Sequence, residues 1–334
     1  MLGVMSPAGD APVVRGPYEI HDERFAPCAH GDLRLERLWD DGRWLEGPAY
    51  FPAGRYLVFS DIPNDRLLRW DETTGAVGVL RSPAHHPNGN TVDLQGRLVT
   101  CEQGERRVTR TEHDGTTTVI ADRFRGLRFN SPNDVVVRSD GSIWFTDPDY
   151  GIASDYEGHR AESEIGGCHV YRVDPASGQT RVVADDFQRP NGLAFSRDER
   201  QLYVADTTAG HIRALDLAED DTSSPVTGGR VFAEPSGGDV DGLRLDADGR
   251  VWTAVGEAVD CYDPDGSLLG RIRVPGRVAN LTFGGARRNR MFLCGGTALY
   301  SLLMSVNGAR RPTTRTALDR SALHRPAKLP LPGG

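Results

Sequence analysis

The feature that most constrains the fold is a short pattern that the sequence repeats six times. The segment LEGPAYFPAGRYLVFSD at 45–61 aligns without a gap on PNGLAFSRDERQLYVAD at 190–206. Each copy has a polar residue, an alternating apolar stretch, a turn containing Gly or Asp, and a second apolar stretch. The other copies lie at 87–102, 132–147, 241–255 and 280–295. Recurrence of one unit along a chain indicates a repeat architecture, in which each unit packs on its neighbours.

Alternation with a period of two residues around a turn predicts a β-hairpin. Most copies are followed by a second hairpin pattern, as at 66–80 and 169–183. Each unit is therefore predicted to be a four-stranded antiparallel meander. The units recur at roughly 40 to 60 residues, which is typical of propeller blades. We predict an all-β fold, a six-bladed β-propeller of four-stranded antiparallel blades spanning residues 31–306.

The segments outside the repeats carry weaker patterns. Residues 1–30 are predicted to form a loosely attached N-terminal arm, and a strand near 33–39 is predicted to close the ring. The third blade carries a long insertion at 147–168, between its second and third strands. Residues 307–334 are rich in Arg and Pro without periodicity, which predicts a mobile or strap-like C-terminal tail.

Composition and charge exclude several classes of function. The net charge is −8, from 39 basic and 47 acidic residues, which argues against a nucleic-acid partner. No stretch reaches the roughly 20 apolar residues of a membrane span, and the N-terminus lacks the pattern of a signal peptide. We therefore expect a cytoplasmic protein with no membrane partner, as a monomer or small homo-oligomer. The five scattered cysteines favour reduced thiols over a disulfide framework or a zinc site.

The repeat places polar residues at two equivalent positions of each blade. The first-strand positions are Glu46, Asn88, Asn133, Asn191, Asp241 and Asn280, and the second-strand positions are Asp61, Glu102, Asp147, Asp206, Val255 and Gly295. The start of one strand and the end of its antiparallel neighbour lie at the same edge of a sheet. The pattern therefore predicts a ring of carboxylates and amides around the axis, whose oxygen atoms favour a hard cation such as Ca²⁺. For any one of these residues, the alternative is a side chain that caps a turn by bonding to its own backbone.

Four motifs connect this pattern to a known family. EGPAY at 46–50, SPNDVVV at 131–137, RPNGLAF at 189–195 and VDGLRLD at 240–246 occur in this order. In combination they resemble the senescence marker protein/gluconolactonase/luciferin-regenerating enzyme family. The resemblance covers most of the repeat region, and it implies a six-bladed propeller with one catalytic divalent ion in the mouth of its tunnel.

Transferred residue by residue, the resemblance implies that the metal ligands are Glu46, Asn133, Asn191 and Asp241. The segment SGGDVDG departs from the Pro-Asp-Gly that is common in the family, so Asp239 competes for the last role. The repeat alignment and the following Gly242 favour Asp241. Calcium is the implied cofactor, with Mg²⁺, Mn²⁺ or Zn²⁺ as substitutes in vitro.

The resemblance also implies hydrolysis of a lactone. Asp241 is the predicted general base for the attacking water, and direct nucleophilic attack by its carboxylate stays open. The residues predicted to bind the hydroxyl groups of the substrate are Asn88, Glu102, Asp147, Tyr150 and Asp206. Such a polar set favours a small sugar lactone, such as gluconolactone, as the partner.

Two other functions fit the same pattern. Related propellers cleave organophosphates at a similar calcium site, so the alternative enzyme is a phosphotriesterase. The alternative without chemistry is a calcium- or ligand-binding propeller that has lost turnover. The sequence lacks GxSxG, HExxH, GxxxxGK(S/T) and GxGxxG. His85 and His86 lie in a turn-like segment, and we interpret them as loop histidines rather than a catalytic dyad.

Overall fold

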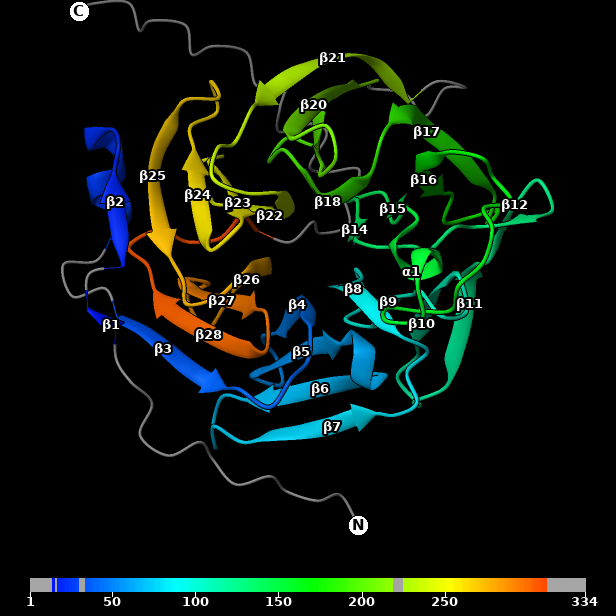
Figure 1. Ribbon diagram of the computed structural model, residues 1–334, viewed down its shortest axis with the longest axis horizontal. Coiled ribbons are helices and arrows are strands. Elements are labelled where there is room, and N and C mark those ends of the chain that lie inside the picture. The colour runs from blue at the N-terminus through cyan, green and yellow to red at the C-terminus, as the bar shows by residue number, and fades with distance from the viewer. Residues whose placement is uncertain (1–13, 16, 30–33, 219–224, 311–334) are drawn as a thin grey trace, which may run out of the picture.

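Six antiparallel sheets stand around a common axis like the blades of a propeller (Figure 1). The computed structural model describes residues 14–15, 17–29, 34–218 and 225–310. Within each blade, consecutive strands are neighbours, and the first strand is the innermost. The predicted six-bladed propeller of antiparallel meanders is therefore confirmed.

The first four blades each run in chain order from the inner strand to the outer strand. Blade one comprises β4 (Leu45–Phe51), β5 (Tyr56–Asp61), β6 (Arg66–Asp71) and β7 (Val77–Arg81). Blade two comprises β8 (Pro87–Val92), β9 (Leu98–Glu102), β10 (Arg107–Thr111) and β11 (Thr117–Ala121). Blade three comprises β14 (Val135–Val137), β15 (Ile143–Asp147), β16 (Cys168–Val173) and β17 (Thr180–Phe187). Blade four comprises β18 (Pro190–Phe195), β19 (Gln201–Asp206), β20 (His211–Leu217) and β21 (Val226–Ala233).

The last two blades include strands from the N-terminal part of the chain. Blade five comprises β22 (Val240–Leu245), β23 (Val251–Val255), β24 (Ala258–Tyr262), β25 (Leu268–Arg273) and β2 (Tyr18–Ile20). Blade six comprises β26 (Val278–Gly284), β27 (Arg290–Gly295), β28 (Ala298–Leu303), β3 (Arg34–Trp39) and β1 (Val14–Arg15). The antiparallel pairing of β3 with β28 joins the two ends of the ring, as the strand predicted near 33–39 requires.

The N-terminal segment differs from the loosely attached arm that we predicted. Strand β2 pairs with β25, and the 3₁₀ helix η1 (Glu23–Cys28) follows it. Phe25 and Cys28 are completely buried against blades five and six. Apolar burial therefore fixes residues 18–28 on the propeller. The tail beyond Arg310 lies outside the described residues, so its limits stay a prediction.

The apolar side chains of the second strands fill the spaces between blades. Phe59, Trp144, Tyr203, Trp252 and Phe292 recur at equivalent positions, and all are buried. Phe292 of blade six, for example, stacks on Tyr50 of blade one with ring centroids 5.7 Å apart. The sheets thus bury both faces against their neighbours, as a closed ring of blades requires.

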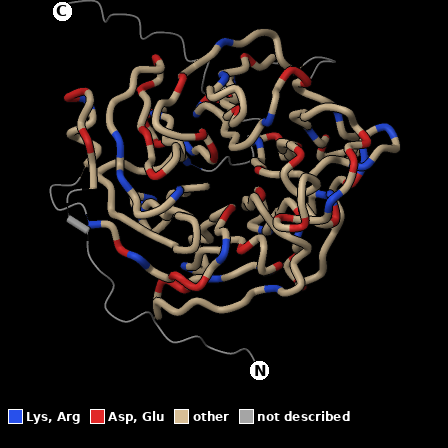
Figure 2. The backbone as a smooth tube through the Cα atoms, in the orientation of Figure 1, with Lys and Arg blue, Asp and Glu red and all other residues tan. Residues whose placement is uncertain are grey.

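A short hairpin and short helices lie outside the strands of the blades. A two-stranded hairpin, β12 (Arg123–Phe124) with β13 (Leu127–Arg128), follows blade two, and the 3₁₀ helix η2 (Ile62–Asn64) follows β5. The insertion between β15 and β16 contains α1 (Tyr150–Ala153). No helix in the described ranges is long and apolar enough to cross a membrane. Acidic and basic residues are interspersed around the whole ring (Figure 2).

The inner strands approach one another closely because a glycine follows the first-strand polar residue in four blades. These glycines are Gly47, Gly89, Gly192 and Gly242. A Cβ atom on Gly192 would lie 2.6 Å from the carbonyl oxygen of Asp241 in the next blade. The pairing register of all four inner strands shifts at this point, and such a bulge re-aims the adjacent side chains. The Glu-Gly, Asn-Gly and Asp-Gly pairs of the repeat therefore serve close packing at the axis.

We expect Gly192→Ala to destabilise the propeller by about 1–3 kcal/mol, because its methyl group would force the inner strands of blades four and five apart. Gly78→Ala is the matched control, since a Cβ atom there meets nothing within 4 Å. Denaturant unfolding of both variants measures the difference. An equal loss of unfolding free energy in the two variants would contradict this prediction, because it would show that the inner strands can move apart to admit a methyl group at no extra cost.

Candidate active site

One end of the axis opens into a cavity of about 530 Å³. Five of the six first-strand positions line it, namely Glu46, Asn88, Asn133, Asn191 and Asp241. All five side chains are buried, with residue exposures of at most 6%. The sixth residue, Asn280, supports the ring, because its Nδ2 donates a hydrogen bond of 3.0 Å to Oε2 of Glu46. The structure thus brings together the residues that the repeat alignment placed on one edge.

Hydroxyl groups of the preceding blade hold two of the asparagines in place. Ser60 Oγ donates to the carbonyl oxygen of Asn88 at 2.6 Å, and Thr146 Oγ1 donates to that of Asn191 at 2.8 Å. The Asn191 amide is oriented further, since its Nδ2 donates to Thr207 Oγ1 at 3.1 Å. The amide oxygen of Asn191 is therefore the atom left to bind a ligand.

Four side-chain oxygens of the cavity are buried without a hydrogen-bond partner among the described residues. They are Oδ1 of Asn88, the hydroxyl oxygen of Tyr150, Oδ1 of Asn191 and Oδ1 of Asp241. A buried acceptor without a donor is costly and points to a missing partner. Among the described residues, no cluster of three or more His, Cys, Asp or Glu could hold a metal, so a cation here must use amide oxygens. The oxygen-only set fits a hard divalent cation, as we predicted for calcium.

Burial makes the two carboxyl groups at the first-strand positions, Glu46 and Asp241, hard to ionise. It raises the pKa of Glu46 well above 4.5, and the charge of Asp241 raises it further. Burial also raises the pKa of Asp241 from 3.8 to about 7; Arg277 lowers this pKa, whereas Glu157 and Asp134 raise it. A cation between the carboxyl groups would favour both charged forms.

The acidic residues at the ends of the second strands do not face the cavity. Oδ1 of Asp147 accepts a hydrogen bond of 2.8 Å from the backbone N–H of Ser131. Oδ1 of Asp206 accepts one of 3.0 Å from the backbone N–H of Arg189. Each carboxylate thus ties down the segment that leads into the first strand of its own blade.

Glu102 is completely buried and paired with arginines. Its carboxylate lies 3.1 Å from Arg81 and 2.7 Å from Arg107. We predicted that Glu102, Asp147 and Asp206 would bind substrate. The structure places all three outside the cavity lining with their oxygens bonded to the protein, which argues against direct contact with a substrate.

The rim of the cavity contains residues that the repeat did not indicate. They are Trp44, Tyr156, Glu157, Arg189, Thr207, Thr208, Asp239 and Arg277. Trp44, Arg189 and Arg277 each stand immediately before an inner strand. An extension of the repeat by one residue could have found Trp44 and Arg189, whereas Arg277 lies three residues before its copy at 280–295. Tyr156 and Glu157 come from the insertion, as does Tyr150, which the sequence indicated and which does line the cavity.

The structure also distinguishes the two candidate aspartates. The side chain of Asp239 is 56% exposed and pairs with Arg277 at 2.9 Å, whereas Asp241 is buried with an unpaired oxygen. Burial beside the other oxygen ligands therefore favours Asp241, as the repeat alignment did.

We expect cation binding to release a proton from Asp241. Its pKa of about 7 in the cation-free protein means that much of this carboxyl group is protonated at about pH 6, and a cation must displace that proton. The apparent affinity for Ca²⁺ should therefore rise with pH and level off above about pH 8. The free energy of unfolding of the cation-free protein should fall as pH rises from about 4 to about 7, because the folded state binds this proton more tightly. Calorimetry in buffers of different ionisation enthalpy measures the released proton, and an affinity independent of pH would contradict the assignment.

A family model described as SMP-30/Gluconolactonase/LRE-like region matches residues 44–296. A gluconolactonase of Zymomonas mobilis is 29% identical over 273 residues, which cover 75% of this chain and 76% of the relative. A pentonolactonase of Haloferax volcanii is 28% identical over 262 residues, which cover 74% and 80%.

Solved structures agree with this match. A gluconolactonase from Xanthomonas campestris superposes with a TM-score of 0.83 at 39% identity, over 90% of this chain and 100% of the other. A calcium-binding protein of Agrobacterium tumefaciens, regucalcin, shares the fold with a TM-score of 0.69 at 23% identity, over 84% and 97%. Because the family model spans well over half of the residues, the chain belongs to the SMP-30/gluconolactonase/LRE-like family.

Proposed function

We propose that the chain is a metal-dependent hydrolase of the calcium type that opens a sugar lactone such as gluconolactone. The observation that carries this proposal is the meeting of Glu46, Asn133, Asn191 and Asp241 in one cavity. Buried acceptor oxygens without donors in that cavity, among the residues that the structure describes, support a cation there. The relatives named gluconolactonase and pentonolactonase support the reaction.

Glu46, Asn133, Asn191 and Asp241 would hold the cation, and all four offer oxygen atoms. Bound there, a divalent ion would polarise the lactone carbonyl and stabilise the negative charge that develops on its oxygen. The oxygen-only set favours Ca²⁺, with Mg²⁺, Mn²⁺ or Zn²⁺ as substitutes in vitro. The chain itself contributes rigidity, because these side chains leave from inner strands that pack tightly at the axis.

Asp241 is our candidate general base. Its Oδ1 is buried without a donor in the described part of the chain, so it can accept a proton from a water molecule in the cavity. As that proton leaves, the water oxygen bonds to the carbonyl carbon. The ring C–O bond then breaks, and the released alcohol oxygen takes up the proton that Asp241 accepted from the water.

The walls of the cavity suit a substrate with several hydroxyl groups. Asn88, Tyr150 and Thr207 offer polar groups, and Trp44 offers an aromatic face. Arg189 lies with its guanidinium carbon 5.0 Å from the centre of the Tyr150 ring. A compact polyhydroxy lactone can use both kinds of wall.

The organophosphate hydrolase and the non-catalytic binding protein stay as alternatives. An organophosphate triester has no ring hydroxyls to pair with Asn88 and Tyr150, so the polar wall favours the lactone. A calcium-binding propeller without turnover would use the same oxygen of Asp241 as a ligand, so the lactonase names of the relatives are what favours the enzyme. The predicted oligomeric state and cellular location stay predictions.

A chelator should abolish lactone hydrolysis, and added Ca²⁺ should restore it. A panel of gluconolactone, unsubstituted δ-valerolactone and paraoxon, assayed with and without metal, measures both the dependence and the substrate class. We expect gluconolactone to be the best substrate. Full activity of the metal-free protein would refute the metal site, and preference for paraoxon would favour the phosphotriesterase.

We expect Asp241→Asn to keep weakened Ca²⁺ binding but to lose turnover by about 10²–10⁴-fold, as a lost general base would cause. Glu46→Gln should weaken Ca²⁺ binding without removing the base, so saturating Ca²⁺ should restore much of its activity. Asp239→Asn is the matched control and should change metal affinity little.

Calorimetry for Ca²⁺ and lactone turnover across Ca²⁺ concentrations separate these variants. If excess Ca²⁺ rescues Asp241→Asn as fully as Glu46→Gln, Asp241 is a ligand only. If Asp239→Asn loses metal binding and Asp241→Asn does not, the assignment of the two aspartates is reversed.

A further inference from the structure

The central channel has a second mouth, opposite to the candidate active site. A cavity of about 380 Å³ lies there. All six inner strands line it, with Ala49–Tyr50, Thr91–Val92, Val136–Val137, Ala194–Phe195, Arg244–Leu245 and Thr282–Phe283. These residues follow the first-strand positions by two to four places. Because a strand rises about 3.3 Å per residue, the two sites lie about 10 Å apart along the axis.

A buried ion pair lies between the two cavities. Arg244 Nη1 is 2.9 Å from Oδ2 of Asp134, and Asp134 is completely buried. Asp134 follows the proposed ligand Asn133, whereas Arg244 lines the second mouth. The positive charge of Arg244 is therefore neutralised by the carboxylate of Asp134, which lies between the two cavities.

The acidic residue of the second mouth is matched as well. Glu199 accepts hydrogen bonds from the backbone N–H and the hydroxyl of Ser139, the former at 2.9 Å. Its carboxylate also lies 3.8 Å from Arg138. Glu199 thus has partners of its own and leaves the remaining cationic groups of the mouth uncompensated.

Three arginines of this mouth have no carboxylate partner among the described residues. They are Arg197, Arg288 and Arg310. Arg197 only donates to the backbone oxygen of Ala247 at 3.3 Å. Burial lowers the pKa of Arg288, and the nearby charge of Arg310 lowers it further. Like charges held together in a concave site are costly unless an anion joins them.

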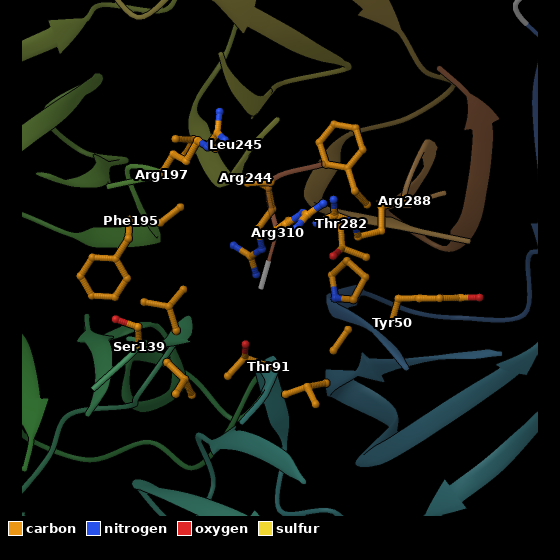
Figure 3. Close-up of a pocket in the computed structure, with 18 of the residues that line it drawn as sticks. Tyr50, Thr91, Ser139, Phe195, Arg197, Arg244, Leu245, Thr282, Arg288 and Arg310 are labelled. Atoms are coloured by element: carbon orange, nitrogen blue, oxygen red, sulfur yellow. The ribbon is translucent and has the colours of Figure 1, made fainter. Parts of the chain in front are cut away.

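The rest of the wall indicates what else the ligand must have. Thr91 and Thr282 present hydroxyls, and Tyr50, Phe195 and Phe283 present rings. In the view of Figure 3, the labelled arginines lie above Thr91 and Ser139, and Phe195 and Tyr50 stand on opposite sides. A site with a cationic side and aromatic walls fits an organic anion that carries a ring, rather than a bare inorganic ion.

We propose that the second mouth of the channel is a binding site for a small organic anion, a phosphate or carboxylate on an apolar ring. Arg288 and Arg310 bind the anionic group, Arg197 adds to the positive potential, and the aromatic side chains contact the ring. The site is separate from the proposed lactone site and does not depend on it.

Calorimetric titration of the metal-free, dialysed protein with phenyl phosphate tests this site, because no cation is then present to bind phosphate at the first mouth. We expect phenyl phosphate to bind more tightly than inorganic phosphate, and benzyl alcohol to bind most weakly. The double variant Arg288→Gln/Arg310→Gln should bind phenyl phosphate at least about 10-fold more weakly, because two charge-assisted contacts are lost.

Arg181→Gln is the matched control, because within the described ranges the guanidinium of Arg181 bonds to the side chain of Gln179 alone and Arg181 lines neither cavity. This variant should bind as the parent does. Lactone turnover and the thermal midpoint confirm that the double variant is folded. No binding of phenyl phosphate up to about 10 mM, or equal affinity in the double variant, would overturn the site. Equal affinity for phenyl phosphate and inorganic phosphate would show that the ring does not contribute to binding, which would contradict the proposed class of ligand.

Discussion

The close approach of the six inner strands at the axis is the constraint on which this propeller depends. A side chain at Gly192 would collide with the backbone of the next blade, and equivalent glycines repeat around the ring. Because these residues have no Cβ, neighbouring backbones come close enough to bond directly, as Gly89 does with Asn133 at 2.7 Å. The polar residue before each glycine is thereby carried to the axis. The same packing that stabilises the fold therefore creates the ring of buried oxygens.

That ring has an electrostatic cost, which explains its chemistry. Burial raises the pKa of both Glu46 and Asp241, and the charge of Asp241 raises that of Glu46 further, so both carboxyl groups resist ionisation. Donors from the protein satisfy only part of the set, and oxygens of Asn88 and Asn191 stay without partners among the described residues. The divalent cation that we propose would compensate both the charge and the unpaired acceptors.

The blades and the loops contribute different things. Inner strands position the proposed ligands, whereas residues just before those strands and the insertion of blade three build the rim. Carboxylates such as Asp147 and Asp206 connect the two, since they hold the lead-in segments through backbone N–H groups. At the opposite mouth the same inner strands end among arginines. One repeat therefore produces two unlike openings, because the two ends of each inner strand carry different side chains.

The number of blades, the closing strand and the polar positions that share an edge could be predicted from the sequence, because strand period and antiparallel geometry are local properties. The resemblance added the implied ligands and the reaction. The burial and the bonding partners of each side chain, in contrast, depend on how the blades pack. Asp241 and Asp239 differ by two positions, yet one is buried at the cavity and the other pairs with Arg277. Glu102 has the position of a substrate-binding residue in the repeat, but its carboxylate pairs with Arg81 and Arg107. The burial of Phe25 likewise depends on blades five and six, which come from the other end of the chain. The burial and bonding of a charged or apolar side chain depend on residues from distant parts of the sequence, and a local pattern does not identify those residues.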